Sequence, residues 1–436
     1  MSEIDETAAQ AHVAAAEREA AHIPGLAPDA RTLPVNSVAI VGAGTMGGGI
    51  AMACANVGIP VTLVEMSQAA LDRGLATIRK NYERSASRGR MTAEDVETRM
   101  ALIAPSLDLA DIAGADLVLE AVFENLDVKR KLFAEIDRHA RPGAVLATNT
   151  STLDVDRIAA ATKRPESVIG LHFFSPANVM RLLEVVRGAK TSDSVIQTAM
   201  AFGQRLKKVP VLARVCFGFI GNRIMFARGW QSMKLLLEGA PPDRVDGALT
   251  GFGMPMGHLA MLDLGGLDID WSVRKERGEP EPVVDALVER KQLGQKTGAG
   301  IYRYEKGDRT PRPNPDTAEI VREAQAARGI RPREISDQEL LERQLYPMVN
   351  EAAKILDEGV AIRPGDIDVV WVYGYGWPAA RGGPMYWADS VGLETIRDRL
   401  RRFHEETGDD AFKPAPLLDR LADQGRTFAA WAKERA

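Results

Sequence analysis

The sequence has no excess of basic residues. It contains 55 Lys and Arg against 60 Asp and Glu, which gives a net charge of -5 at pH 7. Proteins that bind nucleic acid or an anionic membrane surface usually present a basic excess, so both roles are excluded. Any anionic ligand must therefore be held by local cations.

Cysteine and long apolar runs are also scarce. Cys54 and Cys216 stand in apolar surroundings without the spacing of a metal site, so we expect buried free thiols, no bound metal and a reducing compartment. No stretch reaches the roughly 18 consecutive apolar residues of a membrane span. The acidic start, MSEIDETAAQ, is not typical of a secretory signal. These features predict a cytoplasmic protein.

A chain of 436 residues is longer than one hydrophobic core usually organises, so we expect more than one domain. An alanine-rich helix and a linker rich in proline and glycine predict that residues 1–36 stand apart. An α/β domain is expected over residues 37–215, where apolar runs alternate with helical stretches. Helices with short polar turns follow over 216–306 and again over 317–436.

The clearest motif opens the α/β domain. The segment SVAIVGAGTMGGGIAMACANVGIPVTLVEM has the order of a βαβ unit with a glycine cluster at its first turn. Gly42, Gly44 and Gly47 fit G-x-G-x-x-G: the first permits the tight turn, the second lets a pyrophosphate approach the backbone, and the third packs helix on strand. Phosphates should bind the amides of the helix start, where Thr45 and Met46 lie.

Glu65 indicates which dinucleotide binds there. It follows the second apolar run, about 20 residues after the glycine cluster, where the fingerprint's acidic residue meets a ribose hydroxyl. A carboxylate at this position repels a 2′-phosphate. The sequence therefore favours NAD over NADP.

Polar residues follow two of the later strands. Strands are expected at ADLVLEAV, AVLATNT, SVIGLHFF and LLEVV, with an antiparallel one at KKVPVLA. Ligands of such sheets bind beyond the carboxyl ends of the strands, which places Glu124, Lys129 and Ser151 near the nicotinamide half. The alternative is that Glu124 and Lys129 are solvated residues of a helix start and Ser151 is a helix N-cap.

An imidazole and a carboxylate stand in the apolar segment GLHFFSPANVMRLLEVV. Burying them is unfavourable unless each finds a partner. Pro176 predicts a chain reversal that brings His172 and Glu184 face to face. A carboxylate on one ring nitrogen would fix the tautomer and leave the other nitrogen as a general base. The alternative is a buried pair that only ties two strands together.

One pattern occurs twice in the second half. LLLEGAPPDRVDGALTGFGMPMGHLAMLDLGGLD is repeated as ILDEGVAIRPGDIDVVWVYGYGWPAARGGPMYWADSVGLE, with a charged, proline-rich linker at residues 306–316 between the copies. This indicates that one helical unit is duplicated. The fold class is therefore α/β plus all-α, with a Rossmann-type, mostly parallel sheet followed by two duplicated helical domains.

Together, these motifs resemble a known family. GAGTMGGGIA, FENLDVK, NTSTL, HFFSPANVMRLLEVV, GFIGNR and GQKTGAGIYRY resemble, in order and spacing, the motifs of L-3-hydroxyacyl-CoA dehydrogenases. The resemblance covers residues 37–436, because GYGWP and GGPMYWA are similar to the C-terminal part of multifunctional β-oxidation enzymes of the peroxisomal type and their bacterial relatives. No part of this sequence resembles their enoyl-CoA hydratase half.

The resemblance implies an (S)-3-hydroxyacyl-CoA dehydrogenase, which uses NAD to form 3-oxoacyl-CoA in the β-oxidation of fatty acids or related acyl side chains. It implies that His172 is the base and Glu184 its partner, and that Ser151 and Asn222 bind substrate oxygens. On the cofactor side it places Glu124, Lys129 and Lys296. Contacts to the CoA phosphates are not indicated by any motif, and Arg84 and Arg88 are candidates only.

Three positions depart from the family pattern. Ser175 stands where short members often carry Asn, and Glu65 where Asp is usual. His258 replaces a proline in the first copy, and we expect it to be a bystander rather than a second base.

Two alternative functions differ from this one in the residues they would require. A dehydrogenase of free 3-hydroxy acids would usually rely on a lysine base. A non-catalytic NAD-binding scaffold would be expected to lose Ser151, His172, Glu184 or Asn222, and all four are present.

The duplication also predicts the assembly. Short members of the family have one helical unit and pair it with that of a second subunit. Here the second copy should take the partner's place, which gives an intramolecular pseudo-dimer and a monomeric protein, unless separate β-oxidation enzymes bind it. The second copy has no counterpart of GFIGNR, so we expect it to support the fold and do no chemistry.

Overall fold

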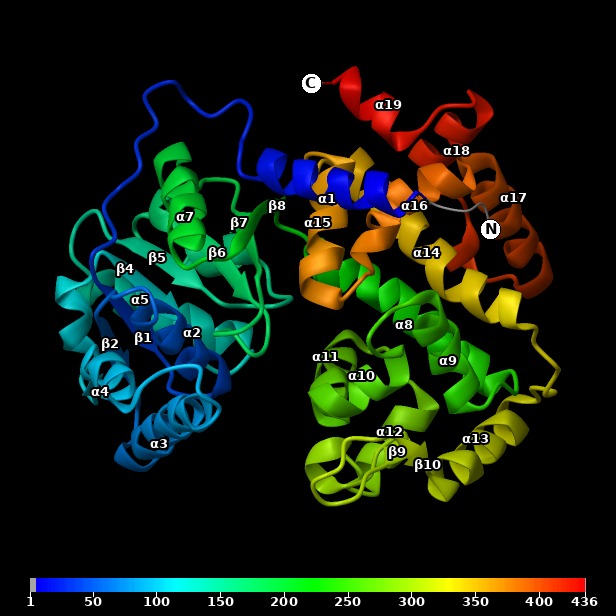
Figure 1. Ribbon diagram of the computed structural model, residues 1–436, viewed down its shortest axis with the longest axis horizontal. Helices are drawn as coiled ribbons and strands as arrows, with labels where there is room; N and C mark the ends of the chain where they lie inside the picture. Colours follow the sequence, from blue (N-terminus) through cyan, green and yellow to red (C-terminus); the bar gives the residue numbers. More distant parts are fainter. Residues whose placement is uncertain (1–4, 436) are drawn as a thin grey trace.

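The computed structural model describes residues 5–435, arranged as a sheet half and a helical half (Figure 1). Helix α1 (Glu6–Ala20) begins at an Asp5 cap and lies against α15 of the helical half. The following linker returns to the sheet half, where the amides of Ala27 and Leu33 bind side chains of α7. The N-terminal segment thus contacts both halves.

The sheet has eight strands in the order β3-β2-β1-β4-β5-β6-β7-β8. The first six strands in chain order are parallel, β7 is antiparallel to β6, and β8 is parallel to β7. This confirms the mostly parallel Rossmann-type sheet, with its order reversing beside β1. The strands are β1 (Val38–Val41), β2 (Val61–Val64), β3 (Ile103–Ser106), β4 (Leu117–Glu120), β5 (Val145–Thr148), β6 (Val168–Phe173), β7 (Leu182–Arg187) and β8 (Val209–Arg214).

Helices cover the sheet, so β1, β4, β5 and β6 are buried along their whole length. Strand β3 was not predicted, because only Ile103 of its residues is buried and Pro105 interrupts the apolar pattern at the sheet edge. The helices of this half are α2 (Thr45–Ala55), α3 (Gln68–Ser87), α4 (Ala93–Ala101), α5 (Leu126–His139), α6 (Val155–Ala159) and α7 (Asp193–Arg205), with 3-10 turns η1 (Leu109–Gly114) and η2 (Pro165–Ser167).

The helical half contains both copies of the duplicated unit. The first comprises α8 (Gly221–Leu237), α9 (Pro242–Phe252), α10 (His258–Gly265), α11 (Leu267–Arg277), α12 (Pro282–Glu289), η3 (Gln295–Thr297) and the hairpin β9 (Tyr302–Arg303) with β10 (Arg312–Pro313). The second comprises α14 (Asp337–Asp357), α15 (Pro364–Tyr375), η4 (Ala379–Arg381), α16 (Pro384–Val391), α17 (Leu393–Thr407), η5 (Asp410–Phe412), α18 (Pro416–Asp423) and α19 (Phe428–Lys433).

Helix α13 (Pro315–Arg328) joins the two copies and packs with the first. Its Ile320 and Ala324 share an apolar core with Leu235 of α8 and with Ile301. Most of α13 lies within residues 317–436, the range that the sequence predicts for the second copy. In the structure the helices of the second copy begin at α14.

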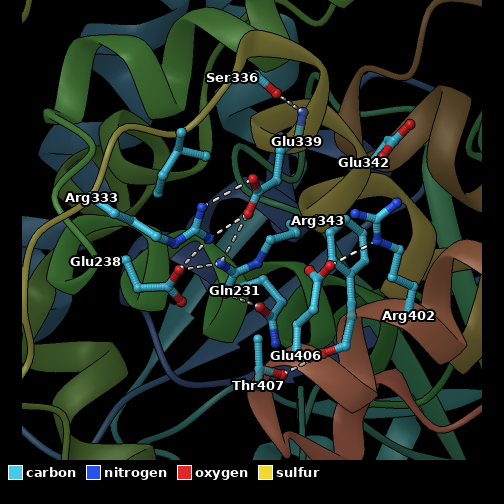
Figure 2. A network of polar contacts seen from close by, with 12 residues as sticks. Gln231, Glu238, Arg333, Ser336, Glu339, Glu342, Arg343, Arg402, Glu406 and Thr407 are labelled. Carbon is cyan, nitrogen blue, oxygen red and sulfur yellow. Dashed lines mark hydrogen bonds and ion pairs between the residues drawn. The ribbon is translucent and has the colours of Figure 1, made fainter.

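Helices α8 and α14 form an interface with internal two-fold character. Each helix supplies one arginine that is buried or half-buried. This arginine binds a glutamate at the end of the other helix, and it also binds a polar residue in the middle of that other helix. Corresponding positions in these two helices are 120 residues apart. Arg223 of α8 binds Glu358 and Glu351. Arg343 of α14 binds Glu238 and Gln231, as Figure 2 shows. Such reciprocal contacts are typical of two-fold dimers, here within one chain.

Candidate active site

The sheet register brings the predicted pair together. His172 on β6 lies opposite Glu184 on β7, and its Nδ1 is 2.6 Å from Glu184 Oε2. Both side chains are buried, with exposed fractions of 6% and 0%. A carboxylate can only accept a hydrogen bond, so Nδ1 carries the proton and Nε2 is left as an acceptor.

The second oxygen of Glu184 reaches the helical half. Glu184 Oε1 accepts hydrogen bonds from the backbone amides of Ile220 at 3.1 Å and Gly221 at 2.9 Å, which open helix α8. The amides and the positive end of the helix dipole stabilise the carboxylate. Glu184 therefore fixes the imidazole and attaches α8 to the sheet with the same group.

Asn222, the next residue of α8, lies between two partners. Its Nδ2 donates to the carbonyl oxygen of Ser151 at 3.3 Å, and its Oδ1 accepts from the hydroxyl of Tyr375 at 2.7 Å. Tyr375 belongs to α15 of the second copy, and its ring contacts Phe174, which in turn stacks near His172. The structure therefore brings Ser151, His172 and Asn222 together at the ends of β5, β6 and α8.

Glu124 organises the turn that carries Ser151. Its Oε1 accepts hydrogen bonds from the Thr150 hydroxyl at 2.6 Å and from the amides of Ser151 and Thr152. Burial would raise the pKa of Glu124, but the Lys129 ammonium and these hydrogen bonds hold it below its usual value. The carboxylate thus stays charged and orders the turn.

Lys129 lies beneath this turn rather than in solvent. Its side chain is 1% exposed, and its Nζ is 2.5 Å from Glu120 and 3.3 Å from Glu124. The alternative of solvated residues at a helix start is therefore excluded for Lys129. Its positive charge compensates the carboxylates of Glu120, at the end of β4, and of Glu124, in the turn before α5.

The glycine turn suits a pyrophosphate. Gly42 has a φ of +109°, and a Cβ there would lie 2.6 Å from the oxygen of Ala121. A Cβ on Gly47 would lie 1.8 Å from the oxygen of Gly42, whereas Gly44 faces open space. Among residues 5–435 no side chain caps α2. The amides of Thr45, Met46 and Gly47 at its start are thus available to phosphate oxygens.

Glu65 lies directly after β2, at the edge where the fingerprint expects a ribose contact. Its Oε2 accepts the amide of Ala43 at 3.0 Å, which links it to the glycine turn. Its position relative to the turn therefore suits the ribose of a bound dinucleotide.

The remaining candidates lie elsewhere. Lys296, on η3 of the helical half, forms an ion pair with Asp268. Arg84 and Arg88 are exposed at the end of α3, and Ser175 precedes a cis peptide bond to Pro176.

His258 is buried at the start of α10 against Gly229. Burial lowers the pKa of its imidazole well below the usual value, so the ring stays neutral.

Tyr375 was not predicted as a site residue. The duplicated motif G-aromatic-G-x-P gave a signal, because it aligns Tyr375 with Phe252 and the two differ by one hydroxyl group. That the hydroxyl meets Asn222 depends on how α15 packs, which no local pattern encodes.

Two other kinds of feature, a membrane-spanning helix and a metal-binding cluster, are absent from residues 5–435. None of their helices has the length and apolar composition needed to cross a bilayer. Within the same residues, no cluster of His, Cys, Asp and Glu is suited to a metal ion. Cys54 and Cys216 are free, and burial raises the pKa of Cys54 to about 12, so it is an unreactive thiol.

A dinucleotide turn and a buried histidine–carboxylate pair at the same edge of a parallel sheet define a nicotinamide-dependent dehydrogenase. The family model for the NAD binding domain of 3-hydroxyacyl-CoA dehydrogenase matches residues 37–216. The model for the family's C-terminal domain matches residues 218–304 and 340–433. The chain belongs to the 3-hydroxyacyl-CoA dehydrogenase family. The predicted cofactor, NAD, is confirmed by the first match.

Relatives of known sequence include the peroxisomal bifunctional enzymes. That of Danio rerio is 42% identical over 411 residues, which are 90% of this chain and 56% of that protein. That of Homo sapiens is 40% identical over 412 residues, which are 90% of this chain and 57% of that protein. The chain thus spans less than two thirds of the length of these relatives.

Solved structures show the same fold. The 3-hydroxybutyryl-CoA dehydrogenase of Escherichia coli K12 matches with a TM-score of 0.78 and 30% identity, covering 90% of this chain and 99% of that one. The dehydrogenase part of multifunctional enzyme 1 from C. elegans matches with a TM-score of 0.68 and 30% identity, covering 94% of this chain and 96% of that one. The predicted fold class is confirmed by these matches.

Replacing Glu65 with alanine should increase the use of NADP relative to NAD, because the repulsion of a 2′-phosphate disappears. NAD should also bind less well, since the contact to the Ala43 amide is lost. The ratio of kcat/KM for the two cofactors measures the change, with Glu83→Ala on the exposed face of α3 as the control. Equal use of both cofactors by the wild type would contradict this account of Glu65.

Proposed function

We propose that the chain oxidises (S)-3-hydroxyacyl-CoA to 3-oxoacyl-CoA with NAD, in the β-oxidation of fatty acids or related acyl side chains. The observation that carries the proposal is the His172–Glu184 pair, whose carboxylate also binds the first amides of α8. The pair supports the proposal because it joins the imidazole to the start of the helix that carries Asn222. Membership in the 3-hydroxyacyl-CoA dehydrogenase family supports the choice of substrate.

Each side chain has a role in this reaction. Bound NAD supplies the hydride acceptor. Nε2 of His172 takes the proton of the 3-hydroxyl group, and Glu184 stabilises the imidazolium that forms. The Ser151 hydroxyl and the Asn222 Nδ2 hold substrate oxygens. Both are positioned before substrate arrives, Ser151 by Glu124 and Asn222 by its two partners.

We assign the acyl chain to a cavity of about 610 Å³ that runs along α8. Phe226, Trp230 and Met233 line it from the face of α8 that also carries Asn222, since their spacing follows the turns of the helix. Phe217 stacks on Phe226 with ring centroids 5.4 Å apart. A chain held at Asn222 can therefore extend along an apolar wall.

Replacing Val273, which lines this cavity from α11, with phenylalanine should shorten the preferred acyl chain. Each excluded methylene group costs about 0.8 kcal/mol, so kcat/KM for 3-hydroxydodecanoyl-CoA should fall about 15-fold for two methylenes, while that for 3-hydroxybutyryl-CoA is kept. Val288→Phe, half-buried outside the cavity lining, is the matched control. An equal fall for both chain lengths would place the acyl group elsewhere.

The substrate class is tested by NADH formation with a panel of 3-hydroxyacyl-CoA thioesters and the matching free 3-hydroxy acids. We expect turnover with thioesters of S configuration. Faster turnover of the free acids would favour the alternative class of dehydrogenase. Absence of turnover with all of them, together with NAD binding, would favour a non-catalytic scaffold.

We also propose that the protein is a monomer, because the reciprocal contacts of α8 and α14 use the face that a second subunit would cover. Association with separate β-oxidation enzymes and a cytoplasmic location stay predictions. The names of several relatives place those proteins in peroxisomes.

A further inference from the structure

The second helical copy makes a direct contact with the candidate active site. The hydroxyl of Tyr375, at the end of α15, is 2.7 Å from Oδ1 of Asn222, although the residues are 153 positions apart. Asn222 is the residue of α8 that we assign to substrate oxygens. A residue of the second copy therefore forms a hydrogen bond with a proposed substrate-binding residue of the first copy.

The polarity of this hydrogen bond is fixed by its surroundings. Asn222 Nδ2 donates to the carbonyl oxygen of Ser151, which can only accept. The carboxamide oxygen must then face Tyr375, so the phenol is the donor. Burial raises the pKa of Tyr375 well above its usual value, which keeps the hydroxyl protonated across the neutral and mildly alkaline range.

The ring of Tyr375 is held in place on several sides. It stacks on Trp371 with centroids 4.5 Å apart and meets Phe174 edge-on at 5.6 Å. A Cβ on Gly221 would lie 2.5 Å from a carbon of the ring, so α8 begins with glycine where the tyrosine packs against it. These contacts restrict the position of the ring, and they therefore hold the hydroxyl next to Asn222.

The duplication provides an internal comparison. Phe252 occupies the corresponding position of the first copy and packs against Trp377 and Trp387. The position that corresponds to Asn222 in the second copy is Glu342, which binds Arg399. The ring is therefore shared by both copies. Its hydroxyl occurs only in the copy that faces Asn222.

We propose that Tyr375 is a positioning residue that holds the Asn222 carboxamide with Nδ2 toward the substrate. Without the phenol donor, Oδ1 of Asn222 loses its partner, and the 3.3 Å contact of Nδ2 with the Ser151 carbonyl is left to hold the carboxamide. Rotation then becomes easier, and it would present an oxygen where a substrate oxygen must bind. The second copy thereby contributes to the reaction through Asn222. This inference rests on the proposed function.

The test uses the full chain with Tyr375→Phe, which removes the hydroxyl and keeps the ring. We expect kcat/KM for 3-hydroxyacyl-CoA to fall about tenfold, and acetoacetyl-CoA, used as a 3-oxoacyl-CoA probe in calorimetry, to bind about tenfold more weakly. NADH binding and Tm should change little. Tyr373→Phe is the matched control, because its hydroxyl lies on the same helix and binds Glu17 of α1 instead.

A double-mutant cycle with Asn222→Ala separates positioning from other roles. In the Asn222→Ala background, Tyr375→Phe should have almost no further effect on either measurement. A loss that persists in full there would mean that the hydroxyl acts without Asn222 and would overturn the proposal. The proposal would also be overturned if the wild type oxidises 3-hydroxyacyl-CoA and the Tyr375→Phe variant has the same kcat/KM. A wild type that oxidises no 3-hydroxyacyl-CoA would instead overturn the proposed function, and the inference with it.

Discussion

Replacing His172 with glutamine is expected to lower kcat by roughly 10²–10⁴-fold, the usual contribution of a general base. Glutamine can still donate a hydrogen bond to Glu184, so the contact that orders β6, β7 and the start of α8 is kept. It cannot take the proton of a hydroxyl group. The loss should therefore appear in turnover and not in folding, as rapid kinetics together with thermal unfolding would show.

NADH binding gives the necessary control for this variant. The phosphates bind at the start of α2, and His172 lies at the end of β6, so the Kd for NADH should be close to that of the wild type. His12→Gln is a matched control, because His12 also pairs with a buried carboxylate, Asp368, at 2.8 Å but lies on α1. A His172→Gln enzyme with wild-type turnover would show that the pair is only structural.

A chain that ends at Glu334, before α14, is expected to lose most of its solubility or to form dimers. Ile224 and Phe252 of the first copy share an apolar core with Met348 and Val349 of α14. Each such side chain contributes about 1.5–3 kcal/mol through burial, so their exposure leaves a large apolar surface. Arg223 would also lose Glu351 and Glu358. Light scattering of both chains measures the outcome.

The full chain should scatter as a monomer in the same experiment. The shortened chain keeps His172, Glu184, Ser151 and Asn222 but lacks Tyr375, so any soluble fraction should turn over slowly. A full-length dimer together with a soluble, monomeric shortened chain would show that the second copy does not replace a partner subunit. In that case the reciprocal contacts of α8 and α14 would stabilise the fold of this chain but would not replace the contacts of a second subunit.

Features that depend on local geometry were determined by the sequence itself. The glycine turn needs residues without a Cβ at Gly42 and Gly47, where any side chain would meet backbone atoms, so the spacing alone indicated the dinucleotide site. A reversal between two apolar runs set the register of β6 and β7, which placed His172 opposite Glu184. The duplication was visible because both copies keep the same turns and caps, as when Asp246 and Asp368 bind the amides that open the helix after them.

The tertiary structure decided the contacts between distant elements. The apolar stripe of a helix indicates that the helix is buried, but it does not indicate which element covers it. Only packing placed Glu184 Oε1 on the amides of α8, buried Lys129 under Glu124, and assigned α13 to the first copy. The same reason applies to Tyr375. Its hydroxyl reaches Asn222 because α15 packs against both β7 and α8, and the free energy that fixes this packing comes from apolar contacts spread over the whole core.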